Sequence, residues 1–180
     1  MEKIFAKVRT KLIAKCDAAR SGQMLQVFVA PAQIRAAATA LRDAGYFLED
    51  VMALDVTQGY IVTYHYENML KPGRITLRAI VPHDAPVVAS IADLATGADW
   101  HERETRDMTG IEFTGHPNLI ALLVPAEDPD QFPLRKTAKA RKPLGEILDL
   151  GEVIQSDGEL DPLFVRAEAG AEAEPAQAEE

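Results

Sequence analysis

Side chains capable of metal chemistry gather in one short stretch of the sequence, between positions 100 and 117. His101, Glu104, Asp107 and His116 supply imidazole and carboxylate groups, the ligand types that divalent metals take in proteins. On a helix, His101 and Glu104 share a face because they lie three residues apart. The spacing matches no recognised metal motif. A small metal-dependent hydrolase built on His101, Glu104 and His116 is therefore the weaker of two hypotheses for this stretch.

The stronger hypothesis is an interface helix crossed by ion pairs. In a helix, Glu102 lies one turn from Arg106, and side chains at this spacing are neighbours. Arg103 lies one turn from Asp107 in the same way. Exposed pairs of this kind contribute under ~1 kcal/mol each. Such a cluster indicates a solvated or docking surface as readily as it indicates an active site.

A second charged stretch has five basic residues among the eight positions 135–142. A short basic segment can bind RNA, an anionic lipid surface or an acidic groove on another protein. Phe132 precedes it, but the regular aromatic side chains of a base-stacking platform are missing from the sequence around it. We therefore expect a protein-docking segment. A nucleic-acid-binding module through residues 135–142 is a third and weaker hypothesis.

Composition bounds the class of protein that carries these two stretches. The chain has 180 residues, of which 47% are apolar, so it can form one sizeable core. Most of its net charge of −9 lies in residues 151–180, which hold nine acids and one base. Residues 1–150 hold nineteen acids and eighteen bases. This nearly neutral body excludes a general nucleic-acid binder with a diffuse basic face.

Cysteine content and hydropathy narrow the class further. Cys16 is the one cysteine, so neither an intramolecular disulfide nor a cluster held by several thiolates can form on this chain alone. The longest uncharged runs have 14 residues, short of the ~20 that span a bilayer. Residues 1–16 lack the continuous apolar core of a secretory signal. We expect a cytosolic protein without a membrane span.

Hydrophobic periodicity in the first part of the chain predicts a helix, a strand and a second helix. Apolar residues from Ile4 to Cys16 recur at helical spacing, which predicts an amphipathic helix with Cys16 buried on it. Leu25–Val29 is typical of a strand. Pro31 then opens a helix that ends at Gly45.

The middle of the chain predicts an α+β fold with an antiparallel sheet and helices packed on one face. Val51–Thr57, Tyr60–Tyr66 and Arg74–Val81 are joined by short turns and should form a meander. Alternate residues of the second strand, from Tyr60 to Tyr66, share one aromatic face. We expect this aromatic face to be exposed to a partner.

The remainder predicts two helices, a short strand and a long loop. Val87–Leu94 and Asp99–Met108 are expected to be helical, with Gly110 ending the second, and Ile111–Phe113 is expected to be a strand. Residues 125–142 should form a loop. Residues 1–150 would form one domain, followed by an extended segment at 151–165 and an acidic, disordered tail at 166–180, which has no large apolar residue.

The charged stretches resemble one protein family. Positions 100–119 read WHERETRDMTGIEFTGHPNL, positions 122–125 read LLVP and positions 132–136 read FPLRK. This order of motifs, with a motif region spanning 90–136, resembles the 30 kDa subunit, also called the C subunit, of proton-translocating NADH:quinone oxidoreductase, respiratory complex I. The residues that carry the match are Trp100, Glu102, Arg103, Glu104, Asp107, Gly110, Ile111, Phe113, Gly115, His116, Pro117, Pro133, Leu134, Arg135 and Lys136.

The resemblance implies a structural subunit with no active site, cofactor or metal of its own. In the family this subunit packs in the peripheral arm beside the quinone-site large subunit and the iron–sulfur subunits. The whole complex uses FMN, iron–sulfur clusters and quinone. The subunit would lie at the cytoplasmic face of the inner membrane, held there by the complex, and would bind no nucleic acid. The interface anchors that we expect are Glu104, Asp107, His116, Arg135 and Lys136.

Two departures from the family pattern leave an alternative open. Thr109 stands where the family commonly has an aromatic residue, and Ile120 and Ala121 stand where it has one or two arginines. The alternative is the equivalent subunit of an energy-converting nickel–iron hydrogenase or of a formate hydrogenlyase-type complex.

Overall fold

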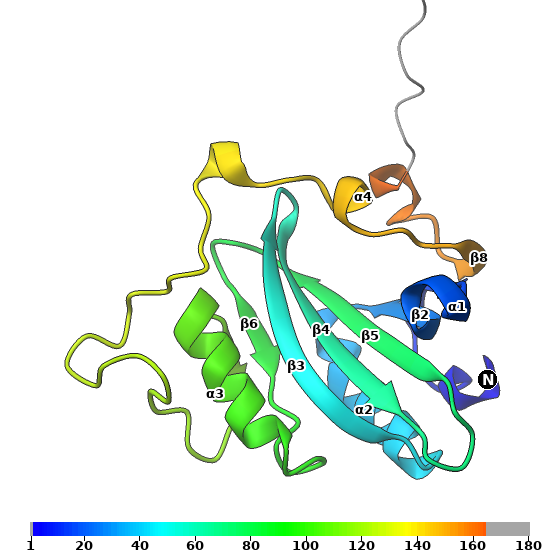
Figure 1. The fold of residues 1–180 in the computed structure, drawn as a ribbon, viewed down its shortest axis with the longest axis horizontal. Helices are drawn as coiled ribbons and strands as arrows, with labels where there is room; N and C mark the ends of the chain where they lie inside the picture. The colour runs from blue at the N-terminus through cyan, green and yellow to red at the C-terminus, as the bar shows by residue number, and fades with distance from the viewer. Residues whose placement is uncertain (1, 165–180) are drawn as a thin grey trace, which may run out of the picture.

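The protein is an α+β domain built on one strongly twisted sheet, and the computed structural model describes its residues 2–164 (Figure 1). The strands are β1 (Thr10–Lys15), β2 (Gln23–Val29), β3 (Phe47–Val56), β4 (Gly59–Glu67), β5 (Arg74–Val81), β6 (Val87–Ala89), β7 (Glu112–Thr114) and β8 (Glu152–Ser156). The helices are α1 (Ala18–Ser21), α2 (Ile34–Asp43), α3 (Ala98–Thr109) and α4 (Leu144–Ile147), with 3-10 turns at Glu2–Phe5, Pro31–Gln33, Ala138–Ala140 and Asp161–Leu163. No helix among these is long and apolar enough to cross a membrane.

Six strands form the main sheet in the order β3-β4-β5-β2-β1-β8. All neighbours are antiparallel except β2 and β5, which run parallel because α2 and the β3–β4 hairpin separate them in the chain. The predicted meander of three strands is confirmed as β3-β4-β5. Two of the predicted helices, the one that Pro31 was expected to open and the one at Asp99–Met108, correspond to α2 and α3. Both helices lie on the same face of the sheet (Figure 1).

The larger core lies between the sheet and these two helices, and it contains the aromatic face of β4. Tyr60, Tyr64 and Tyr66 are each at most 2% exposed and pack in this core. The expectation of an exposed aromatic face was therefore wrong. The aromatic rings on this face of β4 have more apolar surface area than the side chains on its other face. Burying the rings against α2 and α3 is therefore the more favourable arrangement.

The N-terminal segment is also a correction, because Thr10–Lys15 is strand β1 and not part of a helix. Leu12, Ile13 and Ala14 are all buried, since β1 lies between β2 and β8 and both of its faces are covered. A strand buried on both faces shows no alternation, so its apolar residues mimicked helical spacing. Cys16 follows the strand and is only half-buried; its Sγ accepts a hydrogen bond from Gln26 Nε2 at 3.1 Å.

The predicted helix at Val87–Leu94 is likewise wrong: Val87–Ala89 forms strand β6, and the residues that follow form turns and not a helix. β6 pairs in parallel with β7, and the Ser90 N–H extends the pairing by donating to the Thr114 carbonyl at 2.9 Å. Its partner strand lies 25 residues further along the chain, a separation that periodicity within one segment does not report. Gly110 does end α3, with a φ of 75° that suits glycine and an N–H bound to the Arg106 carbonyl at 2.7 Å.

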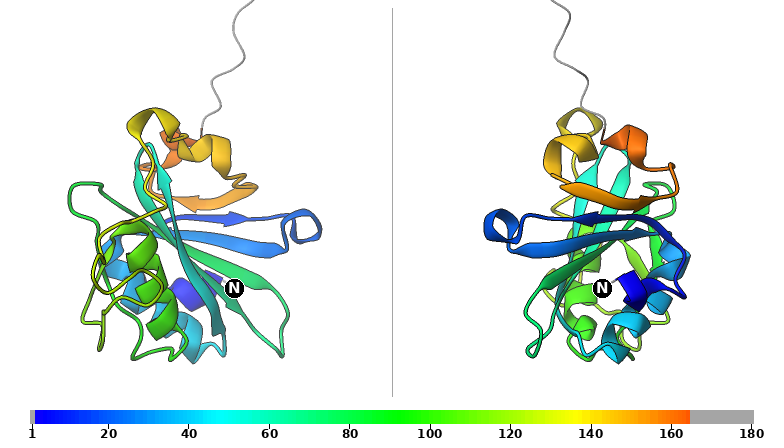
Figure 2. Two further views of the ribbon diagram at one scale, coloured as in Figure 1. Left: turned by 60° about the vertical axis from the view of Figure 1, so that its left-hand side comes forward. Right: turned by 90° about the vertical axis from the view of Figure 1, so that its right-hand side faces the viewer.

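The second face of the sheet is covered by residues 143–164, here called the C-terminal arm (Figure 2). Buried side chains of the arm, led by Leu144, Leu150 and Leu160, pack against Phe28 and Ile61 of the sheet. Val165, which ended the expected extended segment, and the expected tail at 166–180 lie outside the described residues.

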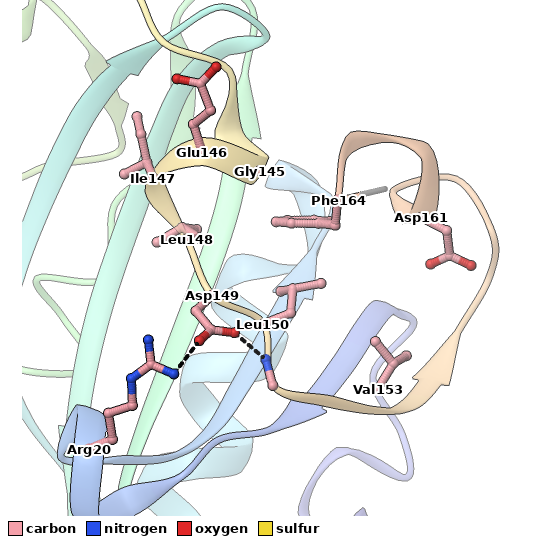
Figure 3. A pocket seen from close by; sticks show the side chains of 11 residues that line it. Arg20, Gly145, Glu146, Ile147, Leu148, Asp149, Leu150, Val153, Asp161 and Phe164 are labelled. Atoms are coloured by element: carbon pink, nitrogen blue, oxygen red, sulfur yellow. Dashed lines mark hydrogen bonds and ion pairs between the residues drawn. The ribbon is translucent and has the colours of Figure 1, made fainter. Parts of the chain in front are cut away.

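The arm also lines an open cavity of about 800 Å³ together with Arg20. Figure 3 shows Arg20 and Asp149 paired at 3.2 Å on one side of this cavity and Phe164 on the other. The Phe164 ring meets the Phe28 ring edge-on at 5.8 Å between centroids. These contacts fasten the arm to β2 and to α1 at its two ends.

Gly151 lies close against the end of β1. Its φ is +73°, and a Cβ there would lie 2.3 Å from the Lys15 carbonyl oxygen. Gly151→Ala should therefore push β8 away from β1 and raise hydrogen exchange at the amides that pair these strands, while the amides of β4 stay protected.

Gly158→Ala is the matched control for this prediction. Gly158 also has a positive φ, of +86°, but no atom lies within 4 Å of a Cβ placed there. Equal exchange of β8 amides in the two variants would show that the close approach at Gly151 does not hold the arm.

Candidate functional site

Helix α3 carries the densest charges of the sequence, and several of them turn inward. Glu102 is 0% exposed. Its Oε2 accepts a hydrogen bond from Ser90 Oγ at 2.5 Å, and its Oε1 accepts one from the Ile91 N–H at 2.8 Å. This carboxyl therefore fixes the chain where it leaves β6. Burial raises the pKa of Glu102 to about 7, against the opposite effect of these two hydrogen bonds.

The His116 side chain lies beside Glu102 and is also fully buried. Its Nδ1 accepts from the Asn118 N–H at 3.0 Å, so its Nε2 carries the proton and donates to the Asp99 carbonyl at 3.1 Å. These two bonds assign the neutral tautomer. His116 joins the turn after β7 to the start of α3, and its ring has no face open to solvent.

Asp107 organises the chain that follows β7. Its side chain is fully buried, and its Oδ2 accepts the N–H groups of Leu122 at 2.7 Å, Leu123 at 2.8 Å and Val124 at 3.4 Å. Burial alone would raise the pKa of this carboxyl, but the three backbone N–H groups and Arg106 outweigh it and lower the pKa. One carboxylate thus replaces the missing backbone partners of an irregular loop.

Two arginines of α3 hold the same loop by its carbonyl groups. Arg103 donates to the carbonyl oxygens of Ile120 at 3.1 Å and Ala121 at 3.3 Å. Arg106 donates to the Pro129 carbonyl at 2.9 Å and to the Asp130 carboxylate at 3.0 Å. The loop from 120 to 130 is therefore bound to α3 along both its N–H and its C=O groups.

The basic stretch is held by a residue that sequence reasoning missed. Asp55 on β3 is buried, and its carboxylate accepts from the Lys136 N–H at 2.8 Å, from Arg141 Nε at 2.7 Å and from His83 Nε2 at 2.8 Å. Burial would raise the pKa of Asp55, but these hydrogen bonds outweigh it and lower the pKa. An acid between the apolar residues Leu54 and Val56 was the only available signal.

Arg135 locks the end of the PLRK motif onto α3. Its Nε donates to the Thr109 carbonyl at 2.7 Å, and its guanidinium lies 4.0 Å from the centroid of the Phe132 ring. The guanidinium also passes close over Gly110, where a Cβ would meet it at 2.1 Å. Glycine at this position therefore ends the helix and leaves room for Arg135.

What remains on the outside is a surface of exposed apolar and charged side chains, here called the α3 outer surface. It consists of the exposed residues of α3 and of the segment that α3 holds, with Trp100 65% exposed. Its apolar members are Trp100, Ile120, Leu123 and Leu134, and its charged members include Glu104, Glu127, Asp128 and Lys136. None of these charged side chains forms an ion pair with another of the described residues.

The expected ion pairs within α3 are not formed. Glu102 points into the core and Asp107 binds backbone N–H groups, so Arg106 pairs instead with Asp130, and Arg103 lies 3.9 Å from Asp99. The helical period placed these residues correctly along α3 but could not report which face was buried.

The proposed metal ligands are not brought together either. Across residues 2–164, no three His, Cys, Asp or Glu side chains are arranged to hold a metal ion. Asp107 and His116 are each committed to backbone groups, as described above, and Glu104 is exposed. Of the remaining motif residues, Ile111 and Phe113 lie in the core, Gly115 has a φ of +80°, and Pro117 and Pro133 are exposed.

Comparison with protein families gives a match over most of the domain. The family described as the 30 kDa subunit of respiratory-chain NADH dehydrogenase matches residues 27–143. The C subunit of NADH-quinone oxidoreductase from Roseiflexus castenholzii is 41% identical over 119 residues, which is 62% of this chain and 68% of that protein. The corresponding C subunit from Xanthobacter autotrophicus is 39% identical over 141 residues, 69% of this chain and 66% of that one.

Two solved structures are similar to this fold. A trypsin-resistant fragment of Nqo5, residues 1–134, superposes with a TM-score of 0.55 at 26% identity and covers 66% of this chain and 95% of the fragment. A chain of the membrane-bound sulfane sulfur reductase, an archaeal respiratory membrane complex, superposes with a TM-score of 0.61 at 18% identity and covers 81% and 85%. The second likeness shows the fold alone.

The raised pKa of Glu102 predicts an unusual pH dependence of stability. Because its folded pKa of about 7 exceeds its ordinary value of 4.5, the folded state binds a proton more tightly than the unfolded state. Its contribution is therefore fully present below about pH 4.5 and is lost as pH rises through 7. Glu102→Gln should remove this loss. Between about pH 5 and about pH 8, the free energy of unfolding measured with urea should fall by about 3 kcal/mol more in the unchanged chain than in the variant. A parallel pH dependence of the two proteins would contradict the assignment.

The contacts of Asp55 predict that its substitution lowers stability and loosens the basic stretch first. Asp55→Asn leaves the Lys136 N–H and Arg141 with a weaker acceptor, and we expect the free energy of unfolding to fall by about 3 kcal/mol. Hydrogen exchange should rise across residues 135–142 first. Asp128→Asn, on an exposed part of the same loop region, is the control and should change stability by under ~0.5 kcal/mol. If the two variants unfold at the same urea concentration, Asp55 does not hold the basic stretch.

Proposed function

Because this chain belongs to the family of the 30 kDa subunit of respiratory-chain NADH dehydrogenase, we propose that it is a structural subunit in the peripheral arm of a complex I-like, proton-translocating NADH:quinone oxidoreductase. It docks beside the quinone-site large subunit and the iron–sulfur subunits. It reaches the cytoplasmic face of the membrane through that complex and performs no redox step itself.

The observation that carries this proposal is that the motif side chains form hydrogen bonds within this chain. Glu102, Asp107 and Arg103 all bind backbone groups of neighbouring loops, so these motif side chains fix the conformation of the loops. What they hold in place is the α3 outer surface, which mixes large apolar side chains with charged side chains of both signs. A desolvated apolar centre with a charged rim is the usual anatomy of a protein interface.

This arrangement assigns different parts to the five expected anchors. Glu104 and Lys136 lie on the α3 outer surface, and they meet the partner directly. Asp107 and His116 are fully buried, so they act through the loops that they hold. Arg135 braces the end of α3 through Thr109 and leaves its exposed side for the partner.

The redox groups of the complex belong to other subunits. A single thiol, Cys16, cannot by itself supply the four thiolates of an iron–sulfur cluster. No step of electron transfer is therefore assigned to this chain. Its part is to keep neighbouring subunits in one geometry, so that electron transfer and the quinone-linked steps occur at fixed distances.

The alternative parent complex is an energy-converting nickel–iron hydrogenase or a formate hydrogenlyase-type complex. It is favoured by the two departures from the family pattern, and one of them, Ile120 and Ala121, lies in the loop that Arg103 holds at the α3 outer surface. A different residue pair at this place would suit a different partner surface.

Purification of the tagged chain from its native membranes separates these hypotheses. Co-purifying cluster-bearing subunits together with NADH:quinone activity support the proposal. Hydrogenase activity with a nickel–iron large subunit moves the chain to the alternative complex. A chain that comes out alone contradicts both.

Asp107 provides the mutational prediction of this proposal. Asp107→Asn replaces one acceptor oxygen by a donor and removes the charge that holds residues 122–124, so we expect the recovered complex to fall by about tenfold. Quantitative mass spectrometry of the purified complex measures this. Glu152→Gln changes an exposed acid of β8, outside the α3 outer surface, and should leave recovery unchanged. Full recovery with Asp107→Asn would show that the loop does not need its carboxylate anchor for docking.

A further inference from the structure

The turn between β4 and β5 displays two apolar side chains to solvent. Met69 is 84% exposed and Leu70 is 91% exposed, the two largest values among the exposed large apolar residues. The turn, residues 68–73, is here called the β4–β5 tip. It lies at the end of the sheet away from the C-terminal arm and away from the α3 outer surface (Figures 1 and 2).

The tip is closed by one carboxylate. Glu67 Oε1 accepts the N–H of Asn68 and the N–H of Gly73, both at 2.8 Å, and so joins the first and last residues of the turn. These two backbone N–H groups lower the pKa of Glu67, which keeps the carboxylate charged and the turn closed.

Asn68 fixes the middle of the tip from inside. It is only 6% exposed, and its Oδ1 accepts the N–H of Leu70 at 2.9 Å and the N–H of Lys71 at 3.1 Å. Its Nδ2 donates to the Ala44 carbonyl at 3.4 Å and so ties the tip to the end of α2. Five hydrogen bonds from two side chains thus hold a six-residue turn.

Exposing these two apolar side chains to water has a free-energy cost unless a partner covers them. Leaving two large aliphatic side chains in water gives up the burial energy of both, about 1.5 to 3 kcal/mol each if fully buried. A rigid backbone, however, loses little entropy when those side chains enter a pocket on a second surface. Adjacent apolar side chains held on a rigid, exposed turn therefore favour contact with an apolar surface of a partner.

We propose that the β4–β5 tip is a second docking point, at which Met69 and Leu70 enter an apolar pocket with an acidic rim on a neighbouring subunit of the complex. The inference rests on the proposed function, because it requires neighbouring subunits. It extends that function from one contact surface to two, on opposite ends of the domain.

The charges around the tip specify the acidic rim. Lys71 is exposed and forms no ion pair with the other described residues. Arg74 is paired with Glu49 at 2.6 Å, and the Glu67 carboxylate is bound by the two N–H groups described above. Glu67 keeps its negative charge but is partly buried, so the exposed charge that the tip presents to a partner is that of Lys71, which complements a negative rim.

A protein pocket fits the tip better than a lipid surface. Two aliphatic side chains and one amine bury less apolar area than a single acyl chain, and one acyl chain gives only marginal membrane binding. Rigidity favours the pocket too, because fluid acyl chains adapt to a flexible segment as readily as to a rigid one. Attachment to lipid is therefore an outcome that the test must distinguish.

The first test places a photo-crosslinking amino acid at position 70 of the tagged chain in the native complex. We expect a covalent adduct with one other subunit, identified by mass spectrometry. Adducts with lipid alone, or incorporation of the chain without any protein adduct, would overturn the inference while leaving the proposed function intact. Recovery of the chain without any other subunit would contradict the proposed function, and this inference with it.

The second test sets a tip variant in competition with the unchanged chain during assembly. Met69→Ser with Leu70→Ser should lower incorporation by about tenfold, because both anchors lose their apolar surface. The melting temperature of the free chain should not change, since both side chains are exposed in it. Incorporation equal to that of the unchanged chain would contradict the inference.

Two further variants identify the cause of that loss. Met69→Leu with Leu70→Met keeps the apolar area and should assemble normally. Asn68→Ala keeps both anchors but frees the turn, so it should assemble at a level between the two double variants. Normal assembly of Asn68→Ala would show that the rigid turn is not part of the docking point.

Discussion

The bond between the Asp107 carboxylate and the N–H groups of residues 122–124 is the contact on which the outward surface of this protein depends. A loop without regular secondary structure needs partners for its backbone groups, and here one buried acid supplies three of them. Arg103 and Arg106 serve the carbonyl groups of the same loop from the same helix. Helix α3 therefore acts as a template on which the loop takes its shape.

The buried contacts of α3 change the meaning of a charged motif. Along the sequence, acids and bases at helical spacing indicate a surface that meets a partner. In the fold, the most deeply placed of them, Glu102 and Asp107, meet only the chain itself. The same principle recurs at Asp55, which fastens the basic stretch, and at Glu67, which closes the β4–β5 tip. Carboxylates that bind backbone N–H groups shape each exposed region, and the surfaces themselves remain free to bind.

Local signals in the sequence were enough for the elements whose contacts are local. The β3-β4-β5 meander, α2 with its opening proline, and α3 with its glycine end were all predicted, because turn chemistry and periodicity report them directly. Strand β1 was missed because it is buried on both faces, and β6 because its partner lies far along the chain. The aromatic face of β4 was assigned to the wrong side because alternation shows that two faces differ but not which is covered. The site showed the same division: its residues were found, but their inward or outward direction depends on tertiary contacts.

The α3 outer surface takes its shape before any partner binds, because the contacts that hold it lie within the chain. Hydrogen exchange at the amides of Leu122 and Leu123 in the free chain tests this most directly. These two N–H groups donate to Asp107 and lie outside any helix or strand, so their protection reports this contact. We expect strong protection in the free chain, equal to that in the assembled complex. Exchange at the rate of an unstructured peptide in the free chain, with protection only after assembly, would contradict it.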